Sequence, residues 1–394
     1  MSRLRLAHRL SCIVTALVGK GMKKTLLALF LFVVFSSCSL PAMGQNSLDE
    51  QLYRAAWEGR LDAIQPLLKQ GAHIEAKVSN SEIQSWATDS TKRTPLIAAA
   101  MNGKIDVMQL LLNKGANVEA KDDDNNTALI DAATGGQAEA VRLLLKKGAK
   151  INVVGAMGET ALDSAAEVGI IDVVQLLLDK GADIEATGNM ANGTALILAA
   201  KNGNADIVKL LLHRGARIEP QGSSGYETPL TRAASNGHAD VVLLLLEKGS
   251  NIESRNSLGQ TALMEAAASG RTEVVRLLLE KGANLEARSN DGGTALLWAA
   301  FRHRGEVARL LLDKGANLDA RTNDGETALI AAACFDTETD KDGTRKTGLV
   351  KLLLEKGANI DAANKDGLTP LTCPNRMNPP AVDDLLEQAS QRRK

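Results

Sequence analysis

The stretch Thr261–Gly293, TALMEAAASGRTEVVRLLLEKGANLEARSNDGG, recurs with small changes along most of the chain. The next copy begins 33 residues later at Thr294, and another begins at Thr327. Related segments in the same frame begin at Thr94, Thr127, Thr160, Thr194, Thr228 and Thr369. A fixed period of this size predicts a solenoid, in which each unit buries its apolar face only against its neighbours.

Each unit predicts two short antiparallel helices followed by a projecting loop. In the Thr261 copy we expect a first helix over 262–268, capped by the hydroxyl of Thr261 and ended by Gly270. A second helix over 272–281 carries apolar residues around most of its circumference, which suits a helix with neighbours on several sides. The Asn-Asp-Gly turn that follows predicts a hairpin-like finger.

Several motifs of the unit together resemble ankyrin repeats: Thr-Pro-Leu or Thr-Ala-Leu, the Ala-Ala pair, Val-Val-x-Leu-Leu-Leu, Lys-Gly-Ala-Asn and Asp-Gly. The resemblance covers residues 48–390 and implies an all-α repeat fold, an ankyrin-type solenoid of stacked helix-turn-helix units with β-hairpin-like fingers. The family usually has a histidine after Thr-Pro-Leu. Because this chain has other residues there, we expect apolar contacts to replace the histidine's hydrogen bonds in several copies. The position holds Ile97, Ile130, Asp163, Ile197, Thr231, Met264, Leu297, Ile330 and Thr372.

The repeat frame divides the chain into four parts. Residues 1–44 form an export signal region, and residues 45–93 form an N-terminal capping repeat with an inserted loop. Residues 94–368 hold eight ankyrin-like repeats, the last with an insertion at 336–345. Residues 369–394 form a C-terminal capping repeat and tail.

The N-terminal region has the pattern of a secretion signal. Met22, a candidate functional start, begins a basic segment that precedes a short apolar run, and Gly44 follows small residues suited to cleavage. We expect a bacterial protein that is exported to the periplasm or secreted. Phe35-Ser-Ser-Cys38 also resembles a lipoprotein box, so an anchor at Cys38 is the alternative, and only lipidation there predicts a membrane attachment.

Charge and motifs argue against nucleic-acid binding and catalysis. The first 44 residues hold six of the 46 basic side chains and no acid, which leaves 40 basic against 47 acidic residues, a net of −7. That balance lacks the basic patch that nucleic acid requires. We find no phosphate loop, metal-ligand spacing or catalytic cluster, so we expect no enzyme activity, cofactor or small-molecule substrate. The alternating acids in the 336–345 insertion lack the spacing of a calcium loop.

Cysteines add little. Cys334 and Cys373 lie in adjacent repeats, but the repeat frame offsets them by about one helical turn, which argues against a disulfide between them.

Two rows of charge follow from the period. Basic residues fall at the end of each second helix, and acidic residues fall within successive fingers. The acids could select a basic partner; the alternative, which we favour, is that cations cap helix dipoles and acids solvate an edge.

Function must reside in surface positions that vary while the scaffold repeats. The resemblance places these positions in a concave groove formed by first helices and finger tips. Residues 45–394 contain only seven aromatic side chains, and aromatic and arginine residues dominate binding hot spots. Alternatively, the aromatics fill space between repeats or pack back on the solenoid. The candidates are Trp298, Phe301, Arg302, Tyr226, Arg232, Trp86 and Met190.

We therefore expect an exported scaffold that binds another protein through its concave groove and finger tips. The alternative is an extracytoplasmic inhibitor or immunity-type protein that shields an enzyme or toxin.

Overall fold

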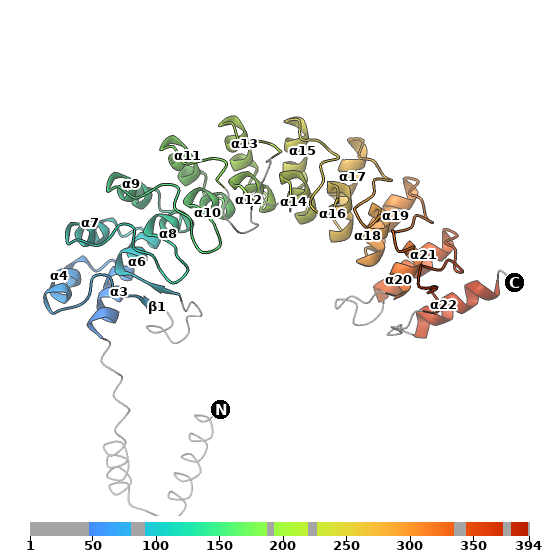
Figure 1. Cartoon of the computed structure of the whole chain (residues 1–394), viewed down its shortest axis with the longest axis horizontal. Helices are drawn as coiled ribbons and strands as arrows, with labels where there is room; N and C mark the ends of the chain where they lie inside the picture. Colours follow the sequence, from blue (N-terminus) through green and yellow to red (C-terminus); the bar gives the residue numbers. More distant parts are fainter. Residues whose placement is uncertain are drawn as a thin grey trace, which may run out of the picture.

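The computed structural model describes residues 47–79, 91–186, 193–219, 227–334, 344–372 and 380–392. Within these residues, nineteen helices stack as successive helix-turn-helix units into one curved solenoid (Figure 1). This arrangement confirms the predicted ankyrin-type, all-α repeat fold. The predicted export region, residues 1–44, lies outside the described residues.

The first helices of the repeats line the inner side of the curve, as Figure 1 shows. They are short and rich in alanine, so neighbouring helices approach closely and the Ala-Ala pairs, such as Ala266 and Ala267, are fully buried. These inner helices are α6 (Pro95–Met101), α8 (Ala128–Thr134), α10 (Ala161–Val168), α12 (Ala195–Lys201), α14 (Pro229–Asn236), α16 (Ala262–Ser269), α18 (Ala295–Phe301) and α20 (Ala328–Cys334).

The second helices form the outer layer. Each buries apolar residues on its inward side, such as Val275 and Leu278 in the Thr261 repeat, and ends where a left-handed glycine follows. Gly282, with φ 87°, is one example. The outer helices are α7 (Ile105–Asn113), α9 (Ala138–Lys146), α11 (Ile171–Asp179), α13 (Ala205–His213), α15 (Ala239–Glu247), α17 (Thr272–Glu280), α19 (Gly305–Asp313) and α21 (Thr344–Glu355).

The N-terminal cap consists of α3 (Leu48–Glu58) and α4 (Leu61–Lys69). Ser47 and Glu50 exchange hydrogen bonds at the start of α3 and so form a capping box. The base of the inserted loop is a short antiparallel ladder of β1 (Val78–Ser79) and β2 (Lys92–Arg93). The two described ends of the inserted segment therefore pair with each other, and residues 80–90 lie outside the described residues.

The C-terminal cap departs from the repeat frame. Thr369–Thr372 forms a turn where the frame places a first helix, and α22 (Pro380–Gln391) follows. Cys334 is disulfide-bonded, and the other three cysteines lie outside the described residues. The sulfur that pairs with Cys334 therefore lies outside the described residues, and the expectation against a disulfide between Cys334 and Cys373 stays a prediction.

The position that the family gives to histidine is buried in the eight repeats from Thr94 to Thr327 and exposed at Thr372 in the C-terminal cap. Ile97, Met264 and Ile330 are at most 1% exposed, which confirms apolar contact in place of histidine. The polar residues at this position instead bond to the threonine that starts their own helix. Thr160 N–H donates to Asp163 Oδ2 at 2.9 Å, and the Thr231 and Thr372 hydroxyls accept equivalent bonds.

Threonine begins every repeat, but its hydroxyl is not always the cap. Thr94 accepts a hydrogen bond from Ile97 N–H, as predicted for this position. Thr261 makes no such bond, and its buried hydroxyl has no hydrogen-bond partner. The expectation of a hydroxyl cap at Thr261 was therefore wrong. Extended backbone at this residue, φ −86° and ψ 167°, starts the helix without the side chain.

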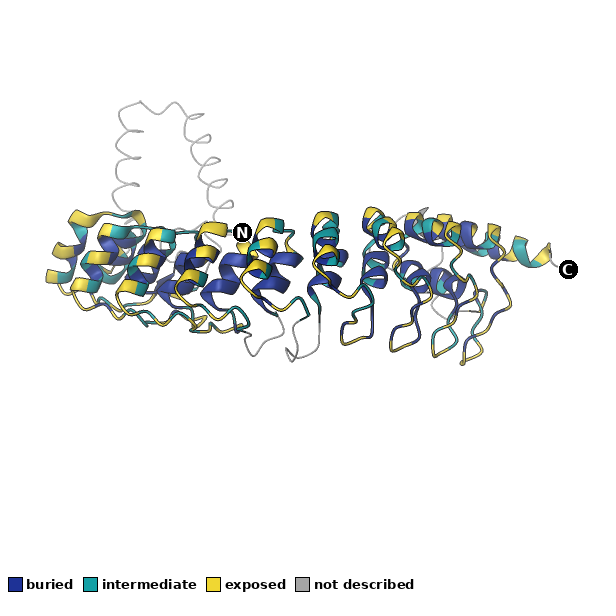
Figure 2. Ribbon diagram, turned by 90° about the horizontal axis from the view of Figure 1, so that it is seen from above, coloured by how far each residue is buried: buried dark blue, intermediate teal, exposed yellow. Residues whose placement is uncertain are grey.

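The acidic row connects the fingers, which project from one long edge of the solenoid (Figure 2). Each acid of the row before Asp361 accepts a hydrogen bond from a backbone N–H in the next repeat. Glu253 accepts from Asn284 at 2.8 Å, Glu286 accepts from Asn317 at 2.8 Å, and Asn152, the one neutral member, uses its amide oxygen in the same way. These acids are structural connectors, so they do not form an unoccupied docking ladder.

Arginines join the last fingers a second time. Arg255 donates to the backbone oxygen of Arg288, Arg288 donates to that of Arg321, and Arg321 donates to Ala363 O at 2.8 Å. Such charge-assisted bonds restrict each finger relative to the next. The fingers after α15 therefore form a continuous, hydrogen-bonded edge.

Candidate functional site

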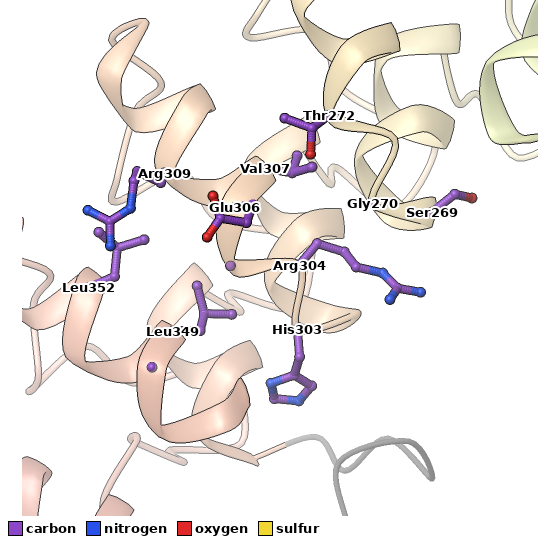
Figure 3. Close-up of a pocket in the computed structure, with 12 residues that line it drawn as sticks. Ser269, Gly270, Thr272, His303, Arg304, Glu306, Val307, Arg309, Leu349 and Leu352 are labelled. Atoms are coloured by element: carbon purple, nitrogen blue, oxygen red, sulfur yellow. The ribbon is translucent and has the colours of Figure 1, made fainter. Parts of the chain in front are cut away.

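Two hollows of similar size lie in the C-terminal half of the solenoid, one on the outer layer and one on the inner face. The outer hollow, of about 430 Å³, is lined by α17, α19 and α21. Figure 3 shows Thr272, Glu306 and Leu349 around it, from three successive repeats. It opens where Gly305 takes the place of Thr272 in the preceding repeat and Gly348 takes the place of Glu306. Missing side chains account for this hollow without a ligand.

The inner hollow, of about 450 Å³, is centred on Trp298 and is called the tryptophan hollow below. Trp298 lies in the middle of α18 and is partly buried. Its indole Nε1–H donates to Ser289 Oγ at 3.3 Å, and its ring centroid lies 5.9 Å from that of Phe301, with the planes tilted by 53°. Packing and a hydrogen bond therefore fix the ring while part of it stays exposed.

Glu265 occupies the place of Trp298 in the preceding repeat and also lines the tryptophan hollow. Burial raises the pKa of its carboxyl, and the nearby Glu227 carboxylate raises it further; the Ser235 hydroxyl, Arg232 and Asn256 act in the opposite direction. Asn256 Nδ2 donates to Glu265 Oε1 at 3.0 Å. The hollow thus contains a carboxyl group in a partly desolvated setting.

Two arginines lie on the side of the hollow nearest the helix-helix turns. Arg304 Nε donates to Ala268 O at 3.0 Å, which anchors its guanidinium on the preceding repeat. Arg302 is exposed, and none of the described residues accepts a bond from its guanidinium. Arg302 can therefore bond to a partner without first breaking an internal contact.

Leu258, at a finger tip, forms the remaining wall. It is 60% exposed although its backbone is held at both ends. Its N–H donates to Asn256 Oδ1 at 3.0 Å, and its carbonyl accepts from Asn290 N–H at 3.0 Å. At the same place the neighbouring fingers carry Asp291 and Asp324. A rigid backbone therefore presents an apolar side chain where the repeat normally has an acid.

The structure brings together four of the predicted site residues. Trp298 and Arg302 line the hollow, and Phe301 packs beside Trp298. Arg232 lies next to Glu227, with Nη2 to Oε1 at 3.8 Å. The other predicted residues, Tyr226, Trp86 and Met190, lie outside the described residues.

Neither Leu258 nor Glu265 is among the candidate residues selected from the sequence. The signal for Leu258 was a leucine at a position that holds aspartate in neighbouring repeats. Its importance depends on exposure, which the sequence does not give. The signal for Glu265 was its equivalence to Trp298 in the frame.

Catalytic and metal sites have no support among the residues that the structure describes. No group of three or more His, Cys, Asp or Glu residues there could hold a metal ion. His238 has a structural contact, with its Nε2 3.0 Å from Lys201 O of the preceding repeat. Within the same residues, no helix is both long enough and apolar enough to cross a membrane.

The stacked helix pairs and the inner hollow define a solenoid interaction scaffold. A family model described as "Ankyrin repeats (3 copies)" matches residues 52–155, 186–256, 232–322 and 283–362, and one described as "Ankyrin repeat" matches residues 157–189. These matches cover most of the chain, which therefore belongs to the ankyrin-repeat family. Domains of this family are generally scaffolds for protein–protein interaction.

Among solved structures, the chain is similar to the crystal structure of the human ASB11 ankyrin repeat domain, with 27% sequence identity and a TM-score of 0.50. The match covers 59% of this chain and 99% of that chain. A comparison with curated proteins gives no match.

Proposed function

We propose that this protein is an exported, bacterial scaffold that binds another protein through the inner face around the tryptophan hollow. The observation that carries the proposal is the combination of exposed Leu258, partly exposed Trp298 and unpaired Arg302 on one face of a rigid scaffold. Aromatic and arginine side chains in a hollow are typical of binding hot spots. Because the fingers are already hydrogen-bonded, little ordering would accompany binding, which favours affinity.

A cross-linking experiment tests the binding surface. A photo-reactive amino acid replaces Arg302 on the inner side in the full chain, and a matched variant carries it at Arg276, an exposed arginine of the outer helix α17. Irradiation in the producing cells should give a higher-mass adduct from position 302 and none from position 276. Equal adducts from both positions, or an adduct only from 276, would exclude the inner face as the binding surface.

Export is supported by the basic and apolar pattern of residues 22–44 and by the disulfide at Cys334, because disulfides persist in oxidising compartments. N-terminal sequencing and mass spectrometry of the exported protein test this part. A start at Gln45 supports cleavage after Gly44, whereas a lipid-modified start at Cys38 supports a membrane-anchored lipoprotein. A chain that retains residues 22–44 in the cytoplasm would refute export.

The inhibitor or immunity-type role would use the same surface. No contact among the described residues favours it over a scaffold role. The activity of a cross-linked enzyme with and without this protein separates the two, because an inhibitor lowers that activity and a scaffold leaves it unchanged.

A further inference from the structure

We infer that the tryptophan hollow takes a lysine or arginine side chain of the partner, with its apolar stem between Leu258 and Trp298 and its cationic head at Glu265. The inference rests on the proposed function and adds the chemistry of the group that enters the hollow.

Charge within the hollow favours a cation at this end. Glu265 and Glu227 interact with each other, and Arg232 is the cation that acts on Glu265. Arg232 lies 3.8 Å from Glu227, a loose ion pair. Two carboxylates therefore share one guanidinium at the Glu265 end of the hollow, which leaves an excess of negative charge there. Of these three groups only Glu265 lines the hollow, and Glu227 and Arg232 lie outside its lining. A partner cation would compensate this charge away from bulk water, where such a pair interacts more strongly than on an open surface.

The walls select the shape of the cationic group. Leu258 and Trp298 provide apolar surface on the path to Glu265, and their positions are set by the contacts of the finger and by Ser289. Lysine and arginine carry several methylene groups below a charged head, so they can cover apolar walls while the head reaches an acid. The face of a tryptophan also attracts cations. A short polar side chain would leave one or both walls exposed to water.

The arginines on the opposite side fix the direction of the partner. Arg302 and Arg304 would repel a cationic head placed beside them, so the head must enter at the Glu265 side. An acidic residue next to the basic one in the partner would then lie near Arg302, whose guanidinium is available for a bidentate contact. The hollow therefore fits a basic residue with an acidic neighbour better than it fits a uniformly basic segment.

A displayed library of random twelve-residue peptides, selected on the full chain, provides a defined probe. We expect the enriched peptides to share a lysine or arginine at one aligned position. Replacing that residue by methionine, which keeps much of the stem and removes the charge, should weaken binding about tenfold. In the protein variant Glu265→Gln the lysine and methionine peptides should bind equally, because a double-mutant cycle isolates this pair. Circular dichroism of Glu265→Gln checks that the fold is retained.

Three outcomes would overturn the inference. The first is a set of enriched peptides without a basic position, and the second is a lysine preference that persists unchanged in Glu265→Gln. The third is an acidic position that recurs without a basic one and whose effect disappears in Arg302→Ala, which would assign the hollow to an anionic group instead. Peptides whose binding is lost in Trp298→Ala but unchanged in Glu265→Gln would refute only this inference. A library with no binder on the inner face, together with no adduct at position 302, removes the proposed function as well.

Discussion

Asp163 should make the stability of the solenoid depend on pH. Its side chain is buried, with 2% of the residue exposed, and its Oδ2 accepts bonds from the N–H and hydroxyl of Thr160 at 2.9 and 2.8 Å. Burial, opposed by the hydrogen bonds from Thr160 and assisted by the nearby Glu159 and Glu167 carboxylates, raises the pKa of this carboxyl from 3.8 to about 6. The folded state therefore binds a proton more tightly than the unfolded state does.

The sign and the magnitude follow from linkage. A raised folded-state pKa contributes stability that is fully present below pH 3.8 and is lost as the pH rises through about 6. A shift of about two units at roughly 1.4 kcal/mol per unit corresponds to about 3 kcal/mol. At neutral pH, Asp163 should thus lower the free energy of unfolding by up to this amount relative to a neutral residue that makes the same bonds.

Thr231 supplies the matched replacement, because it forms the same helix-start bonds without a charge. We expect Asp163→Thr and Asp163→Asn to be more stable than the wild type at pH 7 and to lose this advantage as the pH falls to 4.5. Urea denaturation followed by circular dichroism at pH 4.5, 6, 7 and 8 measures the difference. Asp172→Asn, an exposed change in the same repeat, should stay within about 0.5 kcal/mol of the wild type throughout. A difference that does not vary with pH, or variants less stable at pH 7, would refute the reasoning.

Three further outcomes are expected from other parts of the scaffold. Leu278→Ala, at a fully buried position, should lower the free energy of unfolding measured by urea denaturation by about 2–5 kcal/mol. Leu258→Ala, at a position that is 60% exposed, should lower the free energy of unfolding by less than about 0.5 kcal/mol. Equal losses in the two leucine variants would contradict the burial pattern. Glu286→Ala removes an acceptor for a neighbouring backbone N–H and should lower the free energy of unfolding by about 1 kcal/mol, whereas Glu286→Gln keeps an acceptor and should lower it less. Equal losses in the two variants would show that the charge matters more than the bond. Arg288→Ala should speed amide hydrogen exchange in residues 289–293 and leave α17 and α19 unchanged, and an unchanged finger would show that the arginine contact does not restrain it.

The fold could be predicted almost completely because the same sequence pattern recurs in each repeat. Gly270 and Gly282 mark the helix ends, and both adopt the left-handed backbone that the sequence predicts. Apolar residues such as Ile97 and Ile330 at the usual histidine position are buried, as expected. Local patterns were sufficient here because the contacts of one repeat involve only its neighbours.

Contacts between repeats were harder to predict. Asp163 looked like one more departure from an apolar row, yet its carboxylate serves as a helix cap. The bond from Arg288 to Arg321 joins residues that share one repeat position, so no local pattern indicates which backbone oxygen the side chain reaches. The exposure of Leu258 follows from the finger conformation that these bonds set.

Composition identified part of the site. Trp298 stood out because aromatic residues are scarce, and the structure places it at the centre of the inner hollow. Glu265 and Leu258 are common residue types, so their contribution became visible only once three successive repeats were placed side by side. A site assembled from several repeats cannot be read from any one of them.

The acid-to-amide bonds between fingers also bear on how such a chain can change its length. Every unit carries an acceptor for the unit after it and a donor for the unit before it, as Glu253, Asn284 and Glu286 illustrate. Duplicating a whole unit therefore adds one acceptor together with one donor, and deleting a unit removes one of each. The number of repeats can thus grow or shrink without leaving an unmatched connector inside the array.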